Sequence, residues 1–476
     1  MTAPTRPVKL PDHPDVREDY TLKLVAATAL CVGAPSGDGV TDLPLATDGQ
    51  GRLLVPGTSW AGVLRAAAGR HLPDDSVCSI FGYQDNADGG HASRLFVSDS
   101  VVAVGQVELR NGVGIDRRRA AAAERLLYDR LVLPAGTELA LSLRYEGPST
   151  GDLANLIGIV RAAGLWVGAA TGRGLGRLDC TSATTVRTSL TSRSAVLALL
   201  GRTAKAAEVK PAQVAASGLR FEITWSPTRP VVVGGPAAGE NANLVPVLTA
   251  SGTGLAPLLP GSSVKGVLRG AAERAIRTVL DDRQPPDPDA VKALDALARR
   301  VPVHGEVFGS RDRRGALSIA DTVASTDPVS PDDWLLYVSG KGKPGWLDGE
   351  RTHVAIDRWT GGAAEHRLFT VQETAGVRWP PLVLELDPRR VTTDRRRAAV
   401  VLLGVTIGLL LDGLLGFGHG TTRGLGELEI KSVTVGGAES FGLPAYRTGD
   451  DWWAWLREIA GGADLVELLT EADQRG

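Results

Sequence analysis

Three short motifs occur twice in this chain, in the same order, and this repetition constrains the fold more than any other feature. The first pair is separated by 204 residues, the second by 241 and the third by 250. The pairs are Pro56-Gly57-Thr58-Ser59 with Pro260-Gly261-Ser262-Ser263, Gly114-Ile115-Asp116-Arg117 with Ala355-Ile356-Asp357-Arg358, and Gly172-Arg173-Gly174-Leu175-Gly176 with Thr422-Arg423-Gly424-Leu425-Gly426. Solenoid repeats recur every ~20–50 residues, so these longer periods indicate two copies of a whole domain.

The composition is that of an ordinary globular chain and indicates no particular binding partner. Of 476 residues, 43% are hydrophobic and 22% are charged. A net charge of −2 gives no global basic field, although a local groove can still be basic. The cysteines Cys31, Cys78 and Cys180 lack Cys-x-x-Cys spacing, so we expect neither a disulfide framework nor a zinc knuckle. A reducing, cytoplasmic setting is the simplest expectation.

One apolar stretch, residues 398–417, has the hydropathy of a membrane span. Asp412 interrupts it, and its counterpart at 153–170 carries Asn155 and Arg161, which a bilayer core would penalise. The N-terminus shows no charged-then-apolar signal pattern. We therefore predict two buried helices and no membrane contact.

The expected elements follow the same order in both copies. Apolar alternation predicts strands at 20–32 and 138–145 in the first copy and at 219–225 and 382–386 in the second. A helix follows each Pro-Gly motif, with Ser262 or Ser263 as N-cap in the second copy. The order strand–helix–strand, strand–helix–strand predicts an α+β, ferredoxin-like fold with an insertion between the middle strands.

We expect a first domain at 18–180, a linker with a helix near 194–200 at 181–218, a second domain at 219–437, and a helical tail at 438–476. The tail either packs on the second copy, which we favour, or meets a neighbouring molecule. The second copy is longer, chiefly at 281–302 and 322–352. Their Pro, Asp and Gly content is typical of surface loops.

Together these motifs resemble the RAMP superfamily of CRISPR-associated proteins, in particular the backbone subunit of type III effector complexes. The resemblance covers about 18–180 and 219–437, and it is carried by the runs 260–266, 355–361 and 418–426. It implies two modified ferredoxin-like (RRM-like) domains, each with a thumb-like insertion. It also implies a subunit that binds a CRISPR guide RNA, holds a target RNA against it and contacts other effector subunits.

The Pro-Gly-hydroxyl motif begins a helix, where free amides and the helix dipole favour a phosphate. Ser59, Ser262, Ser263 and Lys265 are therefore candidate RNA ligands, although a plain N-cap explains the motif equally well in the first copy, where Ala61 replaces the lysine. In the family this helix lies along the guide backbone, which adds Arg65 and Arg269 to the candidates.

The glycine-rich motif allows close backbone approach, and Arg173 and Arg423 supply a cation at the same place in both copies. A glycine-rich loop by itself more often marks a hairpin or bulge, and the repeated arginine favours phosphate binding instead. His419 has no counterpart in the first copy, so it is left unassigned.

The Ile-Asp-Arg motif lies in the insertion. The family's thumb wedges into a guide–target duplex. The arginines Arg117, Arg118, Arg119 and Arg358 are therefore expected on the RNA backbone, and Trp359 or Phe369 on a base. For Asp116 and Asp357 we favour a structural role in shaping the hairpin over a role in RNA binding.

Asp42 is the candidate catalytic residue. Family members that cleave target RNA carry an aspartate two residues before a proline in the loop after the first strand, as in Thr41-Asp42-Leu43-Pro44. It would hold a divalent metal, Mg²⁺ above all, at the scissile phosphate. The second copy places Leu244 there when Pro246 is matched to Pro44, with Glu240 nearby but out of register.

These expectations give a guide-RNA-binding subunit that cuts target RNA as a metal-dependent endoribonuclease in its first domain. Asp38 and Asp48, which flank Asp42, are the residues with which the catalytic aspartate is most easily confused. Two alternatives stay open: a non-catalytic RNA-binding scaffold, and an enzyme that processes the guide precursor. The second generally needs histidine acid–base chemistry, and the seven histidines show no duplicated placement.

Overall fold

The computed structural model describes residues 14–34, 41–84, 89–103, 106–116, 121–201, 205–214, 218–235, 242–282, 289–342, 346–347, 349–374, 376–463 and 465–470. These residues form two compact units. The first contains residues up to Glu108 together with Leu131–Thr171 and Gly176–Ala215. The second contains Leu109–Arg130, Gly172–Leu175 and everything from Ala216 onward. Two short segments of the first sequence copy therefore group with the second unit.

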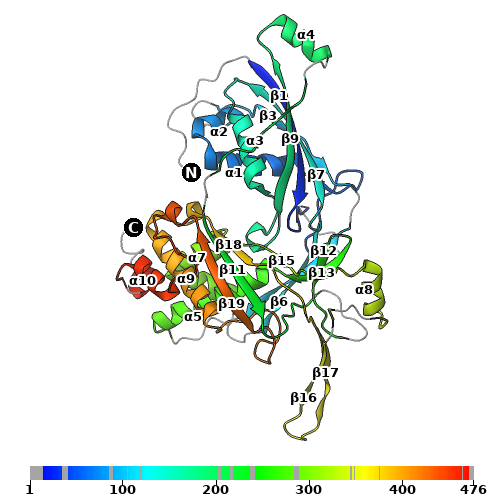
Figure 1. Cartoon of the computed structure of the whole chain (residues 1–476), viewed down its shortest axis with the longest axis vertical. Coiled ribbons are helices and arrows are strands. Elements are labelled where there is room, and N and C mark those ends of the chain that lie inside the picture. Colours follow the sequence, from blue (N-terminus) through cyan, green and yellow to red (C-terminus); the bar gives the residue numbers. More distant parts are fainter. Residues whose placement is uncertain are drawn as a thin grey trace. The chain divides into compact units, whose positions relative to one another are not determined.

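The first unit is built on an antiparallel sheet in the order β10-β9-β1-β7-β3 (Figure 1). Its main strands are β1 (Val16–Ala26), β3 (Leu95–Val97), β7 (Glu138–Gly147) and β9 (Arg177–Ser189), with β10 (Ala207–Glu208) at the edge. Helices α1 (Gly57–His71) and α3 (Asp152–Ala163) contact each other and the sheet. The remaining elements are β2 (Leu54–Val55), α2 (Asp74–Phe81), β4 (Ser100–Val101), β8 (Leu165–Trp166) and α4 (Arg193–Gly201).

The second unit repeats this arrangement with the sheet order β14-β18-β11-β19. The strands are β11 (Leu219–Pro227), β14 (Leu317–Ile319), β18 (Leu382–Leu386) and β19 (Leu428–Gly436), and the helices are α5 (Gly261–Val279) and α9 (Arg396–Leu411). In chain order, both sheets place the fourth strand beside the first, then the third, then the second. This is the ferredoxin-like topology, so the predicted fold is confirmed in both copies.

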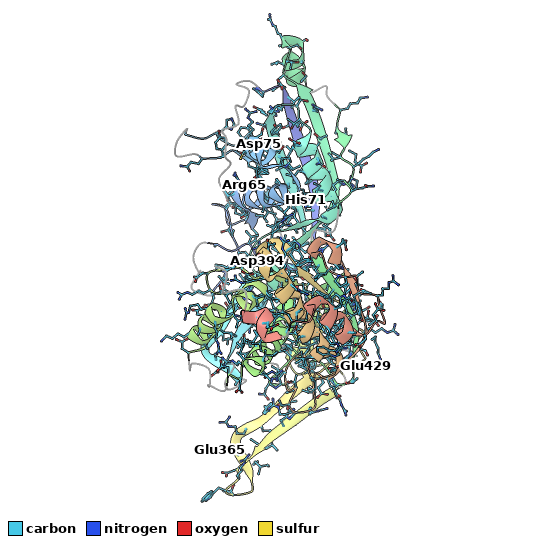
Figure 2. All side chains as sticks on the ribbon, turned by 90° about the vertical axis from the view of Figure 1, so that its left-hand side faces the viewer. Arg65, His71, Asp75, Glu365, Asp394 and Glu429 are labelled. Carbon is cyan, nitrogen blue, oxygen red and sulfur yellow. The ribbon has the colours of Figure 1, made fainter. Side chains whose placement is uncertain are left out.

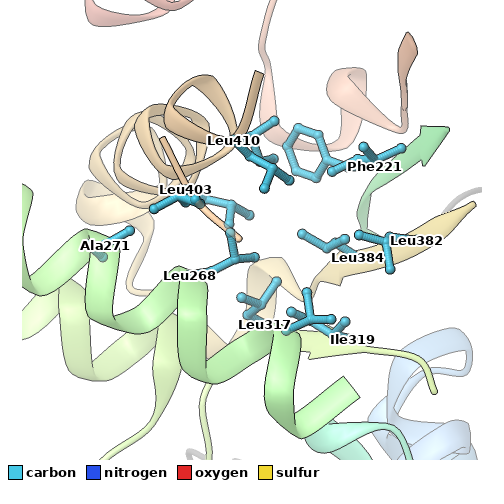
Figure 3. Packing of buried hydrophobic residues seen from close by; sticks show 14 of the residues in the cluster. Phe221, Leu268, Ala271, Leu317, Ile319, Leu382, Leu384, Leu403 and Leu410 are labelled. Carbon is cyan, nitrogen blue, oxygen red and sulfur yellow. The ribbon is translucent and has the colours of Figure 1, made fainter. Parts of the chain in front are cut away.

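Alternating apolar residues explain why these strands form half-buried sheets. In β11, Leu219, Phe221, Ile223 and Trp225 are buried while their neighbours are not. Figure 3 shows Phe221, Leu382 and Leu384 from the sheet with Leu268 of α5 and Leu403 of α9 in one core. Burial of such side chains is worth about 1.5–3 kcal/mol each, which makes this core the main stabilising element of the unit.

Helix α9 corresponds to the apolar stretch that the sequence analysis predicted to be a buried helix, and its side chains are buried on nearly every face. The C-terminal helix α10 (Trp452–Ala460) covers part of it, as the expected packing of the tail on the second copy requires. Trp452 donates a hydrogen bond from its indole nitrogen to the Gly404 carbonyl, 2.9 Å away. Within the described part of the chain, no helix combines the length and apolarity that a bilayer crossing needs.

A hairpin is inserted between the two middle strands of each copy, as predicted. In the first copy it is β5 (Glu108–Asp116) with β6 (Ala121–Val132), and in the second it is β16 (Gly349–Ile356) with β17 (Ala363–Glu373). The β16–β17 hairpin extends away from the rest of its unit (Figure 1). The two insertions are equivalent in topology, which identifies both as thumb-like.

The extra residues of the second copy are more ordered than their composition suggests. Besides loops they contain α6 (Ala290–Arg300) and α8 (Pro331–Val338), so the expectation of surface loops alone was wrong. Leu297 and Tyr337 anchor these two helices because both side chains are buried in the core. The unit also contains α7 (Pro302–Phe308), α11 (Leu465–Thr470), and the short strands β12 (Leu248–Ser251), β13 (Gly254–Leu259) and β15 (Thr322–Val323).

Candidate nucleic-acid interface

An arginine from the glycine-rich motif lies against an aromatic residue of the inserted hairpin in both copies. In the first copy, Nη1 of Arg173 donates to the hydroxyl of Tyr128 at 3.1 Å. In the second, the guanidinium of Arg423 lies over the ring of Phe369, 5.9 Å from its centroid. Both arginines are exposed. A cation beside an aromatic ring at the base of a protruding hairpin is suited to a phosphate and a base of single-stranded nucleic acid.

Two histidines join this pair in the second copy only. Nε2 of His419 lies 2.9 Å from Nη2 of Arg423, and the ring of His353 stacks on Phe369 with centroids 5.0 Å apart. Burial, then the charges of Arg423 and His353, lowers the pKa of His419 below 6.5. His419 is therefore a neutral acceptor for Arg423 near neutral pH. In the first copy, Ala169 stands at the place of His419, which is 250 residues later.

The Pro-Gly motif serves helix packing in both copies. A side chain on Gly57 would place Cβ 2.4 Å from the carbonyl oxygen of Val97, and one on Gly261 would place it 2.2 Å from that of Ile319. Only glycine allows the helix start to approach the end of strand β3 or β14 this closely. The N-cap residues are Pro56 and Pro260, without a side-chain cap, so the prediction of a serine N-cap was wrong.

A carboxylate already occupies the first amide of each of these helices. The Gly57 amide donates to Oδ1 of Asp99 at 2.6 Å, and the Gly261 amide donates to Oδ1 of Asp321 at 2.8 Å. Each aspartate satisfies an amide that the helix leaves unpaired and complements the helix dipole. A phosphate at the same amide would meet this negative charge, so the geometry favours a structural role for the motif. Ser262 is exposed and Ser59 and Ser263 are half-buried; their contact with RNA stays a prediction.

Lys265 lies inside the protein instead of on an open surface. It is 8% exposed, and its Nζ donates to the carbonyls of Leu317 at 2.6 Å and Gly172 at 3.3 Å. Burial, followed by nearby arginines of which Arg269 contributes most, lowers its pKa from 10.5 to about 7. These contacts tie segment 172–175 to the start of α5 within the second unit and weaken the case for Lys265 as a phosphate ligand.

The two predicted helix arginines also have partners within the protein. Arg65, seen on α1 in Figure 2, donates to the carbonyls of Phe81 and Gly82 at the end of α2. Arg269 pairs with Glu273 one turn along α5, at 3.1 Å. Both side chains are half-buried, so any RNA contact would have to share them with these partners.

Sequence reasoning missed Arg110, a buried cation in strand β5. Its Nη2 donates to Oγ1 of Thr249 at 2.8 Å, and its Nη1 lies 3.7 Å from Oδ2 of Asp321. Arg110 and segment 172–175 thus attach first-copy residues to the helix start of the second unit. No sequence pattern signals this contact because its members are far apart in the chain.

The tip of the second hairpin is an exposed turn. Oδ1 of Asp357 accepts from the amide of Trp359 at 2.7 Å, in agreement with a shaping role for this aspartate. Trp359 is 97% exposed, Arg358 is exposed beside it, and Glu365 projects from the next strand (Figure 2). Such a tip can insert an aromatic ring between bases. The predicted ligands Arg117, Arg118 and Arg119, at the tip of the first hairpin, lie outside the described residues.

Asp42 lies exposed in the loop that follows β1. Asp48, one of its two competitors, accepts hydrogen bonds from the amides of Gln50 and Arg52 and from the Arg52 side chain, so it shapes a turn. Asp38 and Glu240 lie outside the described residues. Asp42 therefore remains the catalytic candidate among the described aspartates of this loop.

Backbone hydrogen bonds correct the register of this loop in the second copy. The bonds from Ala34 to Pro44 and from Ala46 to Val32 recur as Gly235 to Val245 and Val247 to Val233, each shifted by 201 residues. The carbonyls of Leu43 and Leu244 likewise both accept from the returning hairpin strand, at Leu131 and Gln372. Asn243, and not Leu244, therefore occupies the place of Asp42. The alignment of Pro44 with Pro246 was wrong by one residue.

No group of three His, Cys, Asp or Glu residues in the described part of the chain is arranged to hold a metal ion. Mg²⁺ is often bound through one or two carboxylates together with phosphate oxygens and water. The exposed carboxylate of Asp42 fits that shared mode of binding, whereas a cage made by the protein alone does not fit these residues.

A protein-family model, the RAMP superfamily, matches residues 23–179 and 228–429. Among solved structures, one match is a chain of the structure described as "Type III-B Cmr-beta Cryo-EM structure of the Apo state". That match has 11% sequence identity and a TM-score of 0.30, and covers 34% of this chain and 96% of the other. No curated protein matches the chain. Because the two regions matched by the family model span well over half of the chain and coincide with its two copies, the protein belongs to the RAMP superfamily and carries two RAMP domains in tandem.

Proposed function

We propose that this protein is a backbone subunit of a type III CRISPR effector complex that binds guide RNA, holds target RNA against it, and cuts the target at Asp42. The observation that carries the RNA-binding part is the pair of arginine–aromatic contacts, Arg173 with Tyr128 and Arg423 with Phe369. These arginines are exposed, so the fold itself does not need them. Each contact would take a phosphate and a base of single-stranded RNA.

RNA binding of this kind depends on phosphate contacts, and it is therefore salt-dependent and nearly independent of spacer sequence. The test is the double variant Arg173→Ala/Arg423→Ala, measured with a guide RNA that carries its repeat-derived tag. Loss of two phosphate contacts lowers the slope of log K against log salt by about 1.4 for a single strand. The matched control is Arg299→Ala/Arg457→Ala, which removes two exposed arginines from α6 and α10. Equal affinities for both double variants would contradict the proposal.

The cleavage step is an internal transfer at the target phosphate. The 2′-oxygen bonds to phosphorus, the bond from phosphorus to the 5′-oxygen breaks, the 2′-hydroxyl proton passes to solvent, and the leaving 5′-oxygen takes a proton from water. The products are a 2′,3′-cyclic phosphate and a 5′-hydroxyl. Asp42 supplies an anionic oxygen in an exposed loop, and this oxygen would hold a divalent cation beside the scissile phosphate. A bound Mg²⁺ would neutralise the charge that develops on that phosphate.

Asp42→Ala separates this enzyme from a non-catalytic scaffold. In the assembled complex we expect cutting of a complementary target to fall by ~100-fold or more while RNA binding is unchanged. Unchanged cutting would leave the scaffold function. Asp48→Ala serves as the control, because Asp48 shapes a neighbouring turn of the same loop.

Processing of the guide precursor is a second candidate, favoured by the grouping of His353 and His419 around Phe369 and Arg423. Two histidines beside a cation are suited to acid–base cleavage of RNA. The double variant His353→Ala/His419→Ala tests it: precursor RNA that is still trimmed at full rate would exclude this function.

A further inference from the structure

We propose that Asn243 stands at the position equivalent to Asp42 and makes the second cleavage site inactive. The second domain would then bind the target as the first does and lack only a carboxylate. This inference rests on the proposed function of Asp42. It differs from a general statement that the second domain does not cut, because it assigns the loss to one side chain.

The equivalence of positions 42 and 243 comes from backbone geometry. Each residue directly precedes the leucine whose carbonyl accepts a hydrogen bond from the returning strand of the hairpin, Leu43 in one copy and Leu244 in the other. The bonds on either side, which join the loop to the segment after the first strand, are also repeated with the same shift of 201 residues. No insertion or deletion separates the two loops at this point.

Asn243 is exposed and held in place. Its amide donates to the carbonyl of Thr370 at 2.9 Å, and its side-chain Oδ1 accepts from the amide of Thr370 at 2.8 Å. The first bond fixes the backbone and the second fixes the side chain against strand β17, which leaves Nδ2 as the other polar group of the side chain. The position is therefore preorganised in the way that a reacting group requires.

An aspartate at 243 would keep this geometry. One carboxylate oxygen replaces Oδ1 as acceptor for the Thr370 amide, and the other replaces Nδ2 with an anionic oxygen. The amide of asparagine is neutral and supplies no anionic oxygen to a divalent cation beside the phosphate. Exposure means that an introduced carboxylate stays ionised at neutral pH. The substitution thus changes charge and almost nothing else.

The experiment uses the assembled complex with guide and complementary target RNA, and maps the 5′-hydroxyl ends of the products. Asp42→Ala/Asn243→Asp should cut the target at one new position, at a rate ~100-fold or more above Asp42→Ala alone. The new position should be displaced from the Asp42 product by a constant number of nucleotides for every target. Asp42→Ala/Asn155→Asp, which makes the same chemical change at an exposed residue of α3, should give no new product.

The single variant Asn243→Asp carries its own assembly control, because the product of the Asp42 site reports an intact complex. If that product forms and no second product appears, the inference is wrong while the proposed function stands. If Asp42→Ala still cuts at the original position, the proposed function itself fails. A second cut that depends on the aspartate at 243 supports both.

Discussion

Asp321→Ala should destabilise the second domain far more than Asp99→Ala destabilises the first, although both aspartates cap the same helix. Asp321 accepts from the Gly261 amide at 2.8 Å, and its side chain is 4% exposed beside the buried Arg110 at 3.7 Å. Asp99 makes the same cap at 2.6 Å but is itself exposed. The two aspartates therefore differ mainly in burial and in the buried arginine that lies beside Asp321.

The magnitudes follow from these contacts. Loss of a helix cap costs about 1 kcal/mol, which is the expectation for Asp99→Ala. Removing one partner of a buried ion pair costs ~3–5 kcal/mol, and the long separation from Arg110 places Asp321→Ala near 3 kcal/mol. With a urea m-value of ~2–3 kcal/mol/M, the midpoint of the second domain should fall by about 1 M.

Tryptophan fluorescence during urea unfolding measures this, because eight of the ten tryptophans lie in the second unit and only Trp60 and Trp166 in the first. The variant Arg110→Met/Asp321→Ala removes both charges and should be more stable than the sum of the single effects predicts. Equal midpoint shifts for Asp99→Ala and Asp321→Ala would falsify the reasoning from burial.

Three further predictions concern the glycines at the helix starts and two titratable side chains, Lys265 and His419. Gly57→Ala and Gly261→Ala should each cost about 1–3 kcal/mol through overpacking, whereas Gly62→Ala and Gly266→Ala, whose added Cβ meets nothing within 4 Å, should stabilise by about 0.5–1 kcal/mol in thermal unfolding. Lys265 has a folded-state pKa of about 7, below its unfolded value, so the folded protein binds fewer protons than the unfolded chain between these two values. The free energy of unfolding of wild type should therefore rise relative to that of Lys265→Met as pH increases from 7 towards 10. A constant difference between the two free energies over this range would contradict the prediction. The pKa of His419 is lowered, so its ring gains a proton only below pH 6.5. The added positive charge should then tighten binding of guide RNA relative to His419→Asn. A ratio of wild-type to variant affinity that stays constant from pH 7.5 to 5.5 would refute this.

The duplication predicted the fold because it identified which segments are equivalent. Once two strand–helix–strand pairs were assigned in each copy, the ferredoxin-like order and the inserted hairpins followed. Helix α9 was also predictable, since Asp412 and the polar residues of its counterpart excluded a membrane span. These are local patterns that the sequence displays directly.

Contacts between distant residues were not predictable. The Pro-Gly motif suggested a phosphate site because its amides seemed open. The carboxylates of Asp99 and Asp321 that occupy them follow strands β3 and β14, and they lie 42 and 60 residues further along the chain. Lys265 looked like a surface cation, yet the carbonyls of Leu317 and Gly172 enclose it. A one-dimensional motif cannot show which groups the fold has already paired.

The register of Asn243 failed for a different reason. Proline lacks a backbone N–H, so it is excluded only from positions whose amide must donate a hydrogen bond. A proline therefore helps to align two copies only where neighbouring positions need that donor. At Pro44 the observed bond uses the carbonyl, and Pro246 pairs with Gly234 through the bonds of its neighbours. Both adjacent positions therefore accept proline, and matching the two prolines shifted the alignment by one residue.

The two copies differ in a way that separates folding from function. The groups repeated in both include buried scaffold contacts, such as Gly176 against the carbonyl of Val167 and Gly426 against that of Phe417, which packing requires. Arg173 and Arg423 are repeated as well, although they are exposed and packing does not require them. An exposed cation that lies beside a hairpin aromatic in both copies is best explained by binding of the same kind of ligand in each. Asp42 and Asn243 occupy equivalent positions with different charge, so under the proposed function RNA would meet a carboxylate in the first copy and a neutral amide in the second.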